Sequence, residues 1–116
     1  MKEPILAILM RTDLNMSRGK MCAQAGHATT LAMMSSDPED VIDWIENNNQ
    51  TKIVLAVDDA QLTNIIAWAT NRGMITSVVK DIGKTELDHD TLTCAAVGIY
   101  PRKRINLLTE GLKALK

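Results

Sequence analysis

The residues from Pro4 to Arg11 form a continuous apolar run, PILAILMR, and this run constrains the fold more than any other feature. Uninterrupted apolar residues over the length of one strand are typical of a strand that is covered on both faces of a sheet. The segment from about Arg18 to Met34 is rich in small residues and predicts a helix with Ser17 or Asn15 as its N-cap. Small side chains let such a helix lie close to a sheet. The start of the chain therefore predicts an α/β fold.

The rest of the chain continues to alternate strand-length runs with helical patterns. A short acidic helix is expected after Asp37 as N-cap, with Pro38 at its first position. Further elements are expected at 51–58 (strand), 59–73 (helix), 74–81 (strand), 92–100 (strand) and 101–116 (amphipathic helix). The spacing predicts that strands 51–58 and 74–81 form a parallel pair joined by a right-handed crossover, and that 92–100 pairs antiparallel with 74–81. The expected architecture is a four-stranded mixed sheet.

The size of the chain limits its organisation and its location. With 116 residues, 46% of them apolar, it has enough material for one core and no room for a second domain. Its apolar stretches are far shorter than the ~20 residues of a bilayer span, and its start lacks the features of a signal peptide. We therefore expect a cytoplasmic protein with no membrane partner.

The residues that commonly bind metals do not form a metal-binding pattern. Cys22 and Cys94 are far apart in the chain with no C-x-x-C spacing, so both are expected to be small core residues. Asp88, His89 and Asp90 are consecutive, and three consecutive side chains in a turn do not point at one ion in an ordinary backbone. The sequence therefore gives no indication of a metal site.

Composition and charge argue against general nucleic-acid binding but leave a local contact open. Aromatic residues make up 3% of the chain, too few for a module that stacks on unpaired bases. The net charge of −1 argues against indiscriminate binding of polyanions. Residues 99–116, however, carry five basic groups and one acidic group, among them Arg102, Lys103 and Arg104. These three are candidates for contact with a phosphate backbone, and the alternative is a solvated helix start.

The first predicted helix carries polar residues in a pattern that suggests a binding or catalytic role. Arg18 and Lys20 lie in its first turn, where the helix dipole is already positive, so their placement favours a bound anion or a developing oxyanion. The alternative is two solvated side chains. Lys20, Gln24 and His27 fall on one helical face. His27 is a candidate general acid or base, or an orienting group, and the alternative is a structural histidine.

A second group of candidates follows the strand predicted at 74–81. Asp81 lies at the carboxyl end of that strand, followed by Gly83, Thr85 and, after the turn, Thr93. The G-K-T of this segment is not a phosphate-binding loop, because Val78 stands where the loop needs a glycine. A carboxylate and two hydroxyls at this edge can hold and deprotonate a water molecule. Ordinary turn hydrogen bonds are the alternative.

Together, two segments of the chain resemble the type 2 peptidyl-tRNA hydrolases, and the likeness covers nearly the whole sequence. Residues 11–28, RTDLNMSRGKMCAQAGHA, are similar to the family signature R-x-D-L-x-M-x-x-G-K-x-A-A-Q-x-x-H-A, with Cys22 in place of an alanine. Residues 81–93, DIGKTELDHDTLT, are similar to D-x-G-x-T-x-x-x-x-G-x-x-T, with Asp90 in place of a glycine. The end of the chain, INLLTEGLK, extends the similarity.

This resemblance implies a three-layer α/β/α sandwich around a four-stranded mixed sheet, a homodimer, and hydrolysis of the ester that joins a peptide to tRNA, without metal or cofactor. It also implies catalytic roles for Lys20, Asp81, Thr85 and Thr93. In the corresponding hypothesis Asp81 activates water, Lys20 stabilises the oxyanion, and the threonines hold the ester and the water. Substrate-binding roles are expected for the remaining candidates, Arg18, Gln24, His27, Gly83, Arg102, Lys103 and Arg104.

Two other functions are compatible with the sequence. One is a non-catalytic module of the same fold that binds tRNA or a protein and dimerises through an apolar face. The other is a nucleotide-binding enzyme that uses residues 83–85. Cleavage of peptidyl-tRNA separates the hydrolase from the first, and stabilisation by ATP or GTP with magnesium would indicate the second.

Overall fold

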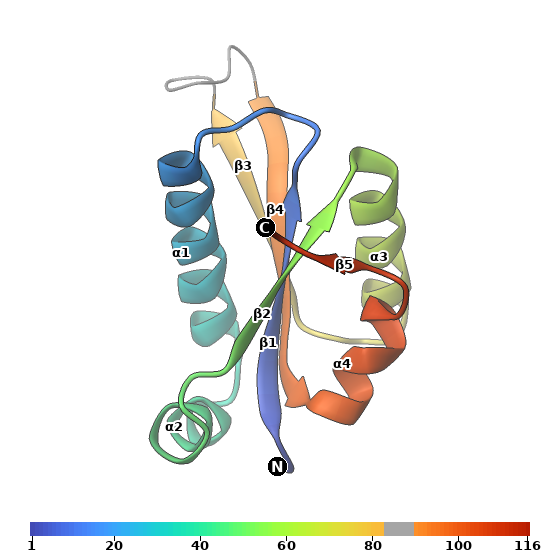
Figure 1. Cartoon of the computed structure of the whole chain (residues 1–116). Coiled ribbons are helices and arrows are strands. Elements are labelled where there is room, and N and C mark those ends of the chain that lie inside the picture. Colours follow the sequence, from blue (N-terminus) through green and yellow to red (C-terminus); the bar gives the residue numbers. More distant parts are fainter. Residues whose placement is uncertain (83–89) are drawn as a thin grey trace.

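The computed structural model describes residues 1–82 and 90–116 and contains a mixed sheet of five strands (Figure 1). The strands are β1 (Pro4–Arg11), β2 (Lys52–Val57), β3 (Thr76–Ile82), β4 (Asp90–Pro101) and β5 (Lys113–Ala114). The helices are α1 (Arg18–Ser35), α2 (Pro38–Asn47), α3 (Asp59–Asn71) and α4 (Arg102–Thr109). The α/β class and the mixed sheet are confirmed.

The strand order in the sheet is β3-β4-β1-β2-β5. Strand β1 pairs parallel with β2 and antiparallel with β4, and β4 pairs antiparallel with β3 as predicted. The expected parallel pair of β2 and β3 is wrong, because β1 and β4 lie between them. The physical reason is burial: β1 is the most continuously apolar run and is buried from Pro4 to Met10, which places it at the centre of the sheet.

The expected count of four strands is also wrong, because the end of the chain is not one helix. Helix α4 ends at Thr109, and Gly111 adopts a φ of 83°, a left-handed conformation that glycine takes without strain. The chain then returns to the sheet, where Lys113–Ala114 pairs antiparallel with β2 and the Leu115 N–H donates to the Val54 carbonyl. Leu112 and Leu115 therefore pack against the hydrophobic core beside the sheet, and they do not form further turns of the helix.

Helices lie on both faces of the sheet (Figure 1). One cluster of buried side chains joins β1 and β4 to α1 and α2 and includes Ala28, Ala32 and Trp44, each with 0% exposure. The other joins the opposite face of the same strands to α3 and α4 and includes Leu62 and Ile105. The small residues of α1 thus face the sheet, as the sequence predicts. Cys94 is buried as expected, but Cys22 is exposed because it lies on a side of α1 that turns away from the core.

Helices α1, α2 and α3 begin where the sequence predicts, each after a residue whose side chain caps the first turn. Ser17, one of the two proposed caps, accepts a hydrogen bond from the Lys20 N–H, and Asp37 accepts one from the Glu39 N–H. Helix α3 begins with a reciprocal capping box between Asp58 and Gln61. Among the residues that the structure describes, no helix combines the length and apolar character needed to cross a bilayer.

Candidate active site

The start of α1 and the end of β3 bring together an ammonium and a carboxylate. The Lys20 Nζ donates to the Asp81 Oδ1 across 2.7 Å. Their side chains are 10% and 7% exposed, so both charges are largely, though not fully, removed from water. The first turn of α1 and the end of β3 lie at the same end of the sheet (Figure 1). Two groups that the sequence placed in separate motifs therefore form one polar centre.

The cap of α1 determines which turn presents Lys20. Because Ser17 takes an extended conformation and binds the Lys20 N–H at 3.1 Å, the helix begins at Arg18. Lys20 then lies in the first turn, beside the backbone N–H groups that a helix leaves without intrahelical partners. A positive side chain, the helix dipole and these donors are close together. Such a combination favours negative charge in a bound group.

One turn further along α1, a buried hydrogen-bond chain ties the helix to the sheet. The Gln24 Nε2 donates to the Thr93 Oγ1 at 2.8 Å, and the Thr93 hydroxyl donates to the Val79 carbonyl at 3.2 Å. Thr93 has 0% exposure and Gln24 has 3%. Val79 precedes Asp81 by two residues on β3, so the chain links the helix that carries Lys20 to the strand that carries Asp81. Burial and this hydrogen bond keep the Thr93 hydroxyl away from solvent.

A β-bulge explains how Thr93 reaches the helix. Val79 pairs with Cys94, whereas Lys80 pairs with Leu92, so Thr93 is the extra residue of β4 at this point. In a regular strand Thr93 and Cys94 would point to opposite faces, because side chains alternate. The extra residue breaks the alternation, and both side chains bond to Gln24, Cys94 through a contact of 3.5 Å from its Sγ to the Gln24 carbonyl. Burial raises the pKa of the Cys94 thiol to about 11.

Arg11 organises the neighbouring loop, and the sequence analysis did not assign it a role. Its guanidinium donates twice to the Asp13 carboxylate, at 3.0 and 2.9 Å, and once to the Leu92 carbonyl at 3.1 Å. Asp59 lies 3.7 Å from the same guanidinium. The hydrogen bonds from Arg11 lower the pKa of Asp13 below its ordinary value. Arg11 thereby joins the end of β1, the loop before α1 and β4, and the signal for this role was the R-x-D at the start of the first motif.

Other predicted site residues lie farther from the ion pair. His27 is exposed on α1 and takes no part in the hydrogen bonds of Gln24. Arg18 is exposed and lines a hollow on the opposite flank of α1. Gly83 and Thr85, which the sequence predicts at the site, lie outside the residues that the structure describes.

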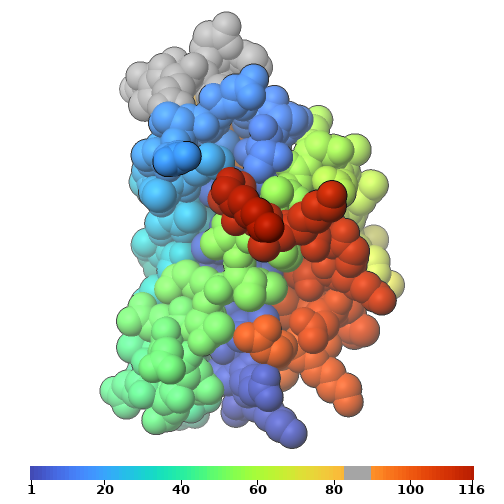
Figure 2. All heavy atoms as spheres, in the orientation of Figure 1, coloured from blue at the N-terminus to red at the C-terminus, as the bar shows by residue number. Residues whose placement is uncertain are grey.

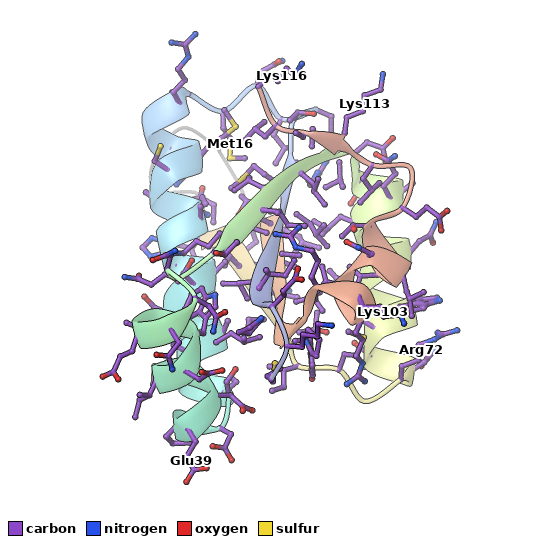
Figure 3. All side chains as sticks on the ribbon, turned by 60° about the horizontal axis from the view of Figure 1, so that its bottom comes forward. Met16, Glu39, Arg72, Lys103, Lys113 and Lys116 are labelled. Carbon is purple, nitrogen blue, oxygen red and sulfur yellow. The ribbon has the colours of Figure 1, made fainter. Side chains whose placement is uncertain are left out.

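The three basic residues at the start of α4 lie at the other end of the sheet. Strand β4 runs from the site end to Pro101, and at ~3.3 Å per residue this places the trio about 30 Å from Asp81. Figure 3 shows Lys103 far from Met16, which precedes α1. Arg102 pairs with Glu3 at 3.4 Å, and Arg104 lies 4.4 Å from the centre of the Tyr100 ring.

Asp90, which replaces the glycine of the family signature, is the first described residue after the turn. It begins β4 and pairs with Ile82. In the described part of the chain, no group of three histidine, cysteine, aspartate or glutamate residues is arranged to hold a metal ion.

Comparison of the sequence with those of known proteins identifies one family. The sequence model of the peptidyl-tRNA hydrolase PTH2 family matches residues 5–115, which include both halves of the ion pair. This chain belongs to that family. It is 40% identical over 114 residues to a peptidyl-tRNA hydrolase of Aeropyrum pernix, with 92% of each chain covered. It is 32% identical over 113 residues to a peptidyl-tRNA hydrolase of Methanocaldococcus jannaschii, covering 95% of this chain and 98% of the relative.

The fold of this PTH2 family member is also similar to that of a solved structure. A protein of unknown function from Agrobacterium tumefaciens strain C58 superposes with a TM-score of 0.59 over 100% of both chains. The two sequences are 16% identical, so this likeness concerns the fold alone.

Proposed function

We propose that this protein hydrolyses the ester between the peptide and the tRNA of peptidyl-tRNA and so returns free tRNA to translation. The observation that carries the proposal is the contact of 2.7 Å between Lys20 and Asp81 at one end of the sheet. Family membership and the relatives named peptidyl-tRNA hydrolase support the substrate. Ester hydrolysis needs an activated water and a stabilised oxyanion, and a carboxylate beside an ammonium meets both needs.

In the proposed mechanism, Asp81 accepts a proton from water as the water oxygen attacks the ester carbonyl. The carbonyl oxygen becomes an oxyanion, which the Lys20 ammonium and the first-turn N–H groups of Arg18 and Gly19 stabilise. The Lys20 N–H does not take part, because Ser17 already accepts it. When the tetrahedral intermediate collapses, the bond from the carbonyl carbon to the ribose oxygen breaks. The ribose oxygen takes the proton that Asp81 holds, which restores the carboxylate.

Within this proposal Thr93 and Gln24 are positioning residues. The Thr93 hydroxyl is buried and donates to the Val79 carbonyl, which supports a role in holding β3 against α1. Thr85 is proposed to hold the ester, and Gly83 to let the substrate approach, on the basis of the family signature. Arg18 and His27, which are both exposed on α1, are proposed to contact the substrate outside the ion pair. Arg102, Lys103 and Arg104 are proposed to contact the tRNA backbone away from the ester.

Several features of the whole molecule belong to the same proposal. The chain is proposed to act as one domain with a three-layer α/β/α sandwich, supported by the two buried clusters on opposite faces of the sheet. It is proposed to work in the cytoplasm, without metal or cofactor, as a homodimer. Exposed apolar side chains on α1 and α2, namely Leu31, Met34 and Ile42, support a second copy as partner. Light scattering on the purified protein gives the oligomeric state directly.

The release of free tRNA from purified peptidyl-tRNA tests the proposed function. The unmodified protein is expected to release tRNA, and Lys20→Met and Asp81→Asn are each expected to lower the rate by about 10²–10³-fold. Lys80→Ala is the matched control, because Lys80 is an exposed cation on the same strand as Asp81. Binding of tRNA without release would overturn the proposal and identify a non-catalytic module. Turnover of both variants within about threefold of the unmodified protein would overturn the assignment of the site.

A further inference from the structure

The outer edge of β3 is the longer of the two edges of the sheet. In the described part of the chain, β3 pairs with β4 on one side and with no strand on the other, so it ends the strand order. The opposite edge is β5, which has two residues, and the red end of the chain lies at the surface there (Figure 2). Strand β3 has seven residues. Short edge strands commonly protect a sheet against unwanted strand pairing, and β3 does not have this protection.

The backbone of β3 presents hydrogen-bonding groups along this edge. The Ile75 carbonyl, just before β3, accepts from the Gly98 N–H of β4 at 3.3 Å. The Val79 carbonyl accepts from the Thr93 hydroxyl of β4 at 3.2 Å, so both carbonyls point toward β4. The peptide groups of successive residues in a strand point to opposite edges. The N–H and C=O groups of Val78, and of the residues two positions away, therefore point outward, where a further strand can bind them.

The side chains of β3 leave this edge open to a partner. Val78 is 42% exposed and Ile82 is 62% exposed. The strand contains no proline, and of its two charged side chains Asp81 is buried while Lys80 is exposed. Proline and charged side chains are the usual means by which proteins block an edge strand. The edge of β3 therefore combines outward backbone groups with an exposed and mainly apolar face.

The edge leads directly to the ion pair. Asp81 lies near the carboxyl end of β3, beside the first turn of α1, and contacts Lys20 (Figure 1). Val78 is three residues earlier, about 10 Å along the strand at ~3.3 Å per residue. In peptidyl-tRNA the ester joins the carboxyl end of the peptide to the ribose. With that ester at the ion pair, a peptide that follows the edge runs in the same direction as β3 and reaches Val78 within about four residues.

We propose that the peptide of peptidyl-tRNA adds to the free edge of β3 as a parallel strand, which ends with its ester at Lys20 and Asp81. The proposal rests on the proposed function, which supplies the substrate. Peptides on tRNA differ in sequence, and the groups that they share are the N–H and C=O of the backbone. Strand addition binds a peptide through these groups. It therefore supplies affinity for the peptide without selecting its side chains.

A scan with N-methylated peptides on the unmodified protein tests the strand pairing. The probe is tRNA that carries acetyl-tetraalanine through an amide bond, which replaces the ester and resists hydrolysis. One N-methylalanine stands at the second, third or fourth residue from the tRNA. Because only every second residue of a strand directs its N–H toward one neighbour, the Kd is expected to rise about 3–10-fold at alternate positions and to stay within about twofold at the position between. Equal effects at all three positions, or no effect at any, would overturn the proposal.

Removal of one edge N–H from the protein gives the complementary test. Val78→Pro removes an N–H that points away from β4, and edge positions of this kind tolerate proline. The Kd of the tetraalanine probe is expected to rise about 3–10-fold, whereas that of a probe with one acetylated alanine, too short to reach Val78, should stay within about twofold. Val78→Ala keeps the N–H and should bind the long probe more tightly than Val78→Pro does. Equal losses with both probes, in a variant with unchanged circular dichroism, would overturn the proposal.

A second copy of the chain is the competing occupant of this edge. Two β3 strands that pair in a dimer would cover the same N–H groups, and Val78→Pro would then lower the mass measured by light scattering. We expect the same mass for Val78→Pro and the unmodified protein. A dimer that Val78→Pro converts to a monomer would assign the edge to the second copy and overturn the proposal.

The binding scan needs neither turnover nor a variant, so its failure is distinct from failure of the proposed function. It also decides the question where Val78→Pro does not fold. A protein that releases tRNA from the ester but shows no alternation in the scan would overturn the inference alone. A protein that shows the alternation but releases no tRNA would overturn the hydrolase and retain a peptide site along β3.

Discussion

The Lys20 ammonium lies 2.7 Å from the Asp81 carboxylate, although 61 positions separate the two residues in the chain. Neither side chain is more than 10% exposed, so their attraction is screened less than that of a surface pair. Ser17 sets the helical position of Lys20, and the bulge at Thr93 shapes the sheet beside Asp81. The contact therefore depends on a local cap and on the tertiary packing of α1 against β3.

The double variant of the ion pair is expected to be little worse than either single variant. Groups that act as a unit in catalysis lose most of the rate when one is removed. Lys20→Met and Asp81→Asn should each lower kcat by about 10²–10³-fold. The kcat of the double variant should be at most about threefold below that of the less active single variant. Single-turnover kinetics measures this, with circular dichroism to confirm folding. A loss equal to the product of the single losses would show that the two residues act independently.

Removing the Thr93 hydroxyl is expected to lower the stability of the protein and to slow the reaction without abolishing it. Thr93→Val keeps the shape but leaves the buried Gln24 amide without its acceptor, which costs about 1–3 kcal/mol of unfolding free energy. We expect kcat to fall about tenfold while KM stays within twofold, because the ester still binds. Thr93→Ser retains the hydroxyl and should restore most of the rate. A Thr93→Val variant with unchanged kcat would contradict the positioning role.

The basic residues at the start of α4 are expected to affect binding and not the chemical step. Replacing Arg102, Lys103 and Arg104 by alanine should raise KM and leave kcat unchanged, because they lie about 30 Å from Asp81. The salt dependence of log kcat/KM should become shallower by roughly one for each tRNA phosphate that the variant no longer neutralises. Arg72→Ala serves as the control for removal of an exposed cation. An unchanged KM and salt dependence would assign the trio to local interactions with Glu3 and Tyr100.

The Arg11–Asp13 contact is expected to make stability depend on acid pH. The hydrogen bonds from Arg11 lower the pKa of Asp13 in the folded state, so this contribution is present above the unfolded pKa, about 4. It is lost as the pH falls through the folded value. Because the Asp13 side chain is 38% exposed, solvent screening limits the contribution to at most about 1 kcal/mol. Urea unfolding should show that Asp13→Asn lowers the free energy of unfolding more at pH 6 than at pH 3. An equal loss of unfolding free energy at the two pH values would contradict this dependence on the Asp13 pKa.

Two glycine substitutions are expected to have opposite effects on stability. A Cβ at Gly98 would lie 2.9 Å from the Ile5 carbonyl oxygen, at a φ of 134° that L-residues rarely adopt. Gly98→Ala should therefore lower the unfolding free energy by at least about 2 kcal/mol. Gly26 lies within α1 with nothing within 4 Å of the added atom, so Gly26→Ala should raise it by about 0.5–1 kcal/mol. Thermal unfolding followed by circular dichroism compares them, and a stable Gly98→Ala protein would contradict the close approach.

The features that the sequence predicted correctly are those that depend on neighbours in the chain. The caps Ser17 and Asp37 bind the first N–H groups of their helices within a few residues, so their signals are local. Every residue from Pro4 to Met10 is apolar, which predicts a buried strand without knowledge of its partners. The grouping of Lys20 with Asp81 depended on the spacing of the two signatures and on both lying at element ends.

The sequence alone therefore determined the α/β class, the helix starts and the candidate chemical groups, because periodicity and capping act over a few residues. Only the tertiary structure decided the strand order, the fifth strand after Gly111, the exposure of Cys22 and the bulge that turns Thr93 toward Gln24. Each of these depends on which apolar surfaces are buried against one another across distant parts of the chain. That choice minimises exposed apolar area over the whole molecule, and no local pattern encodes it.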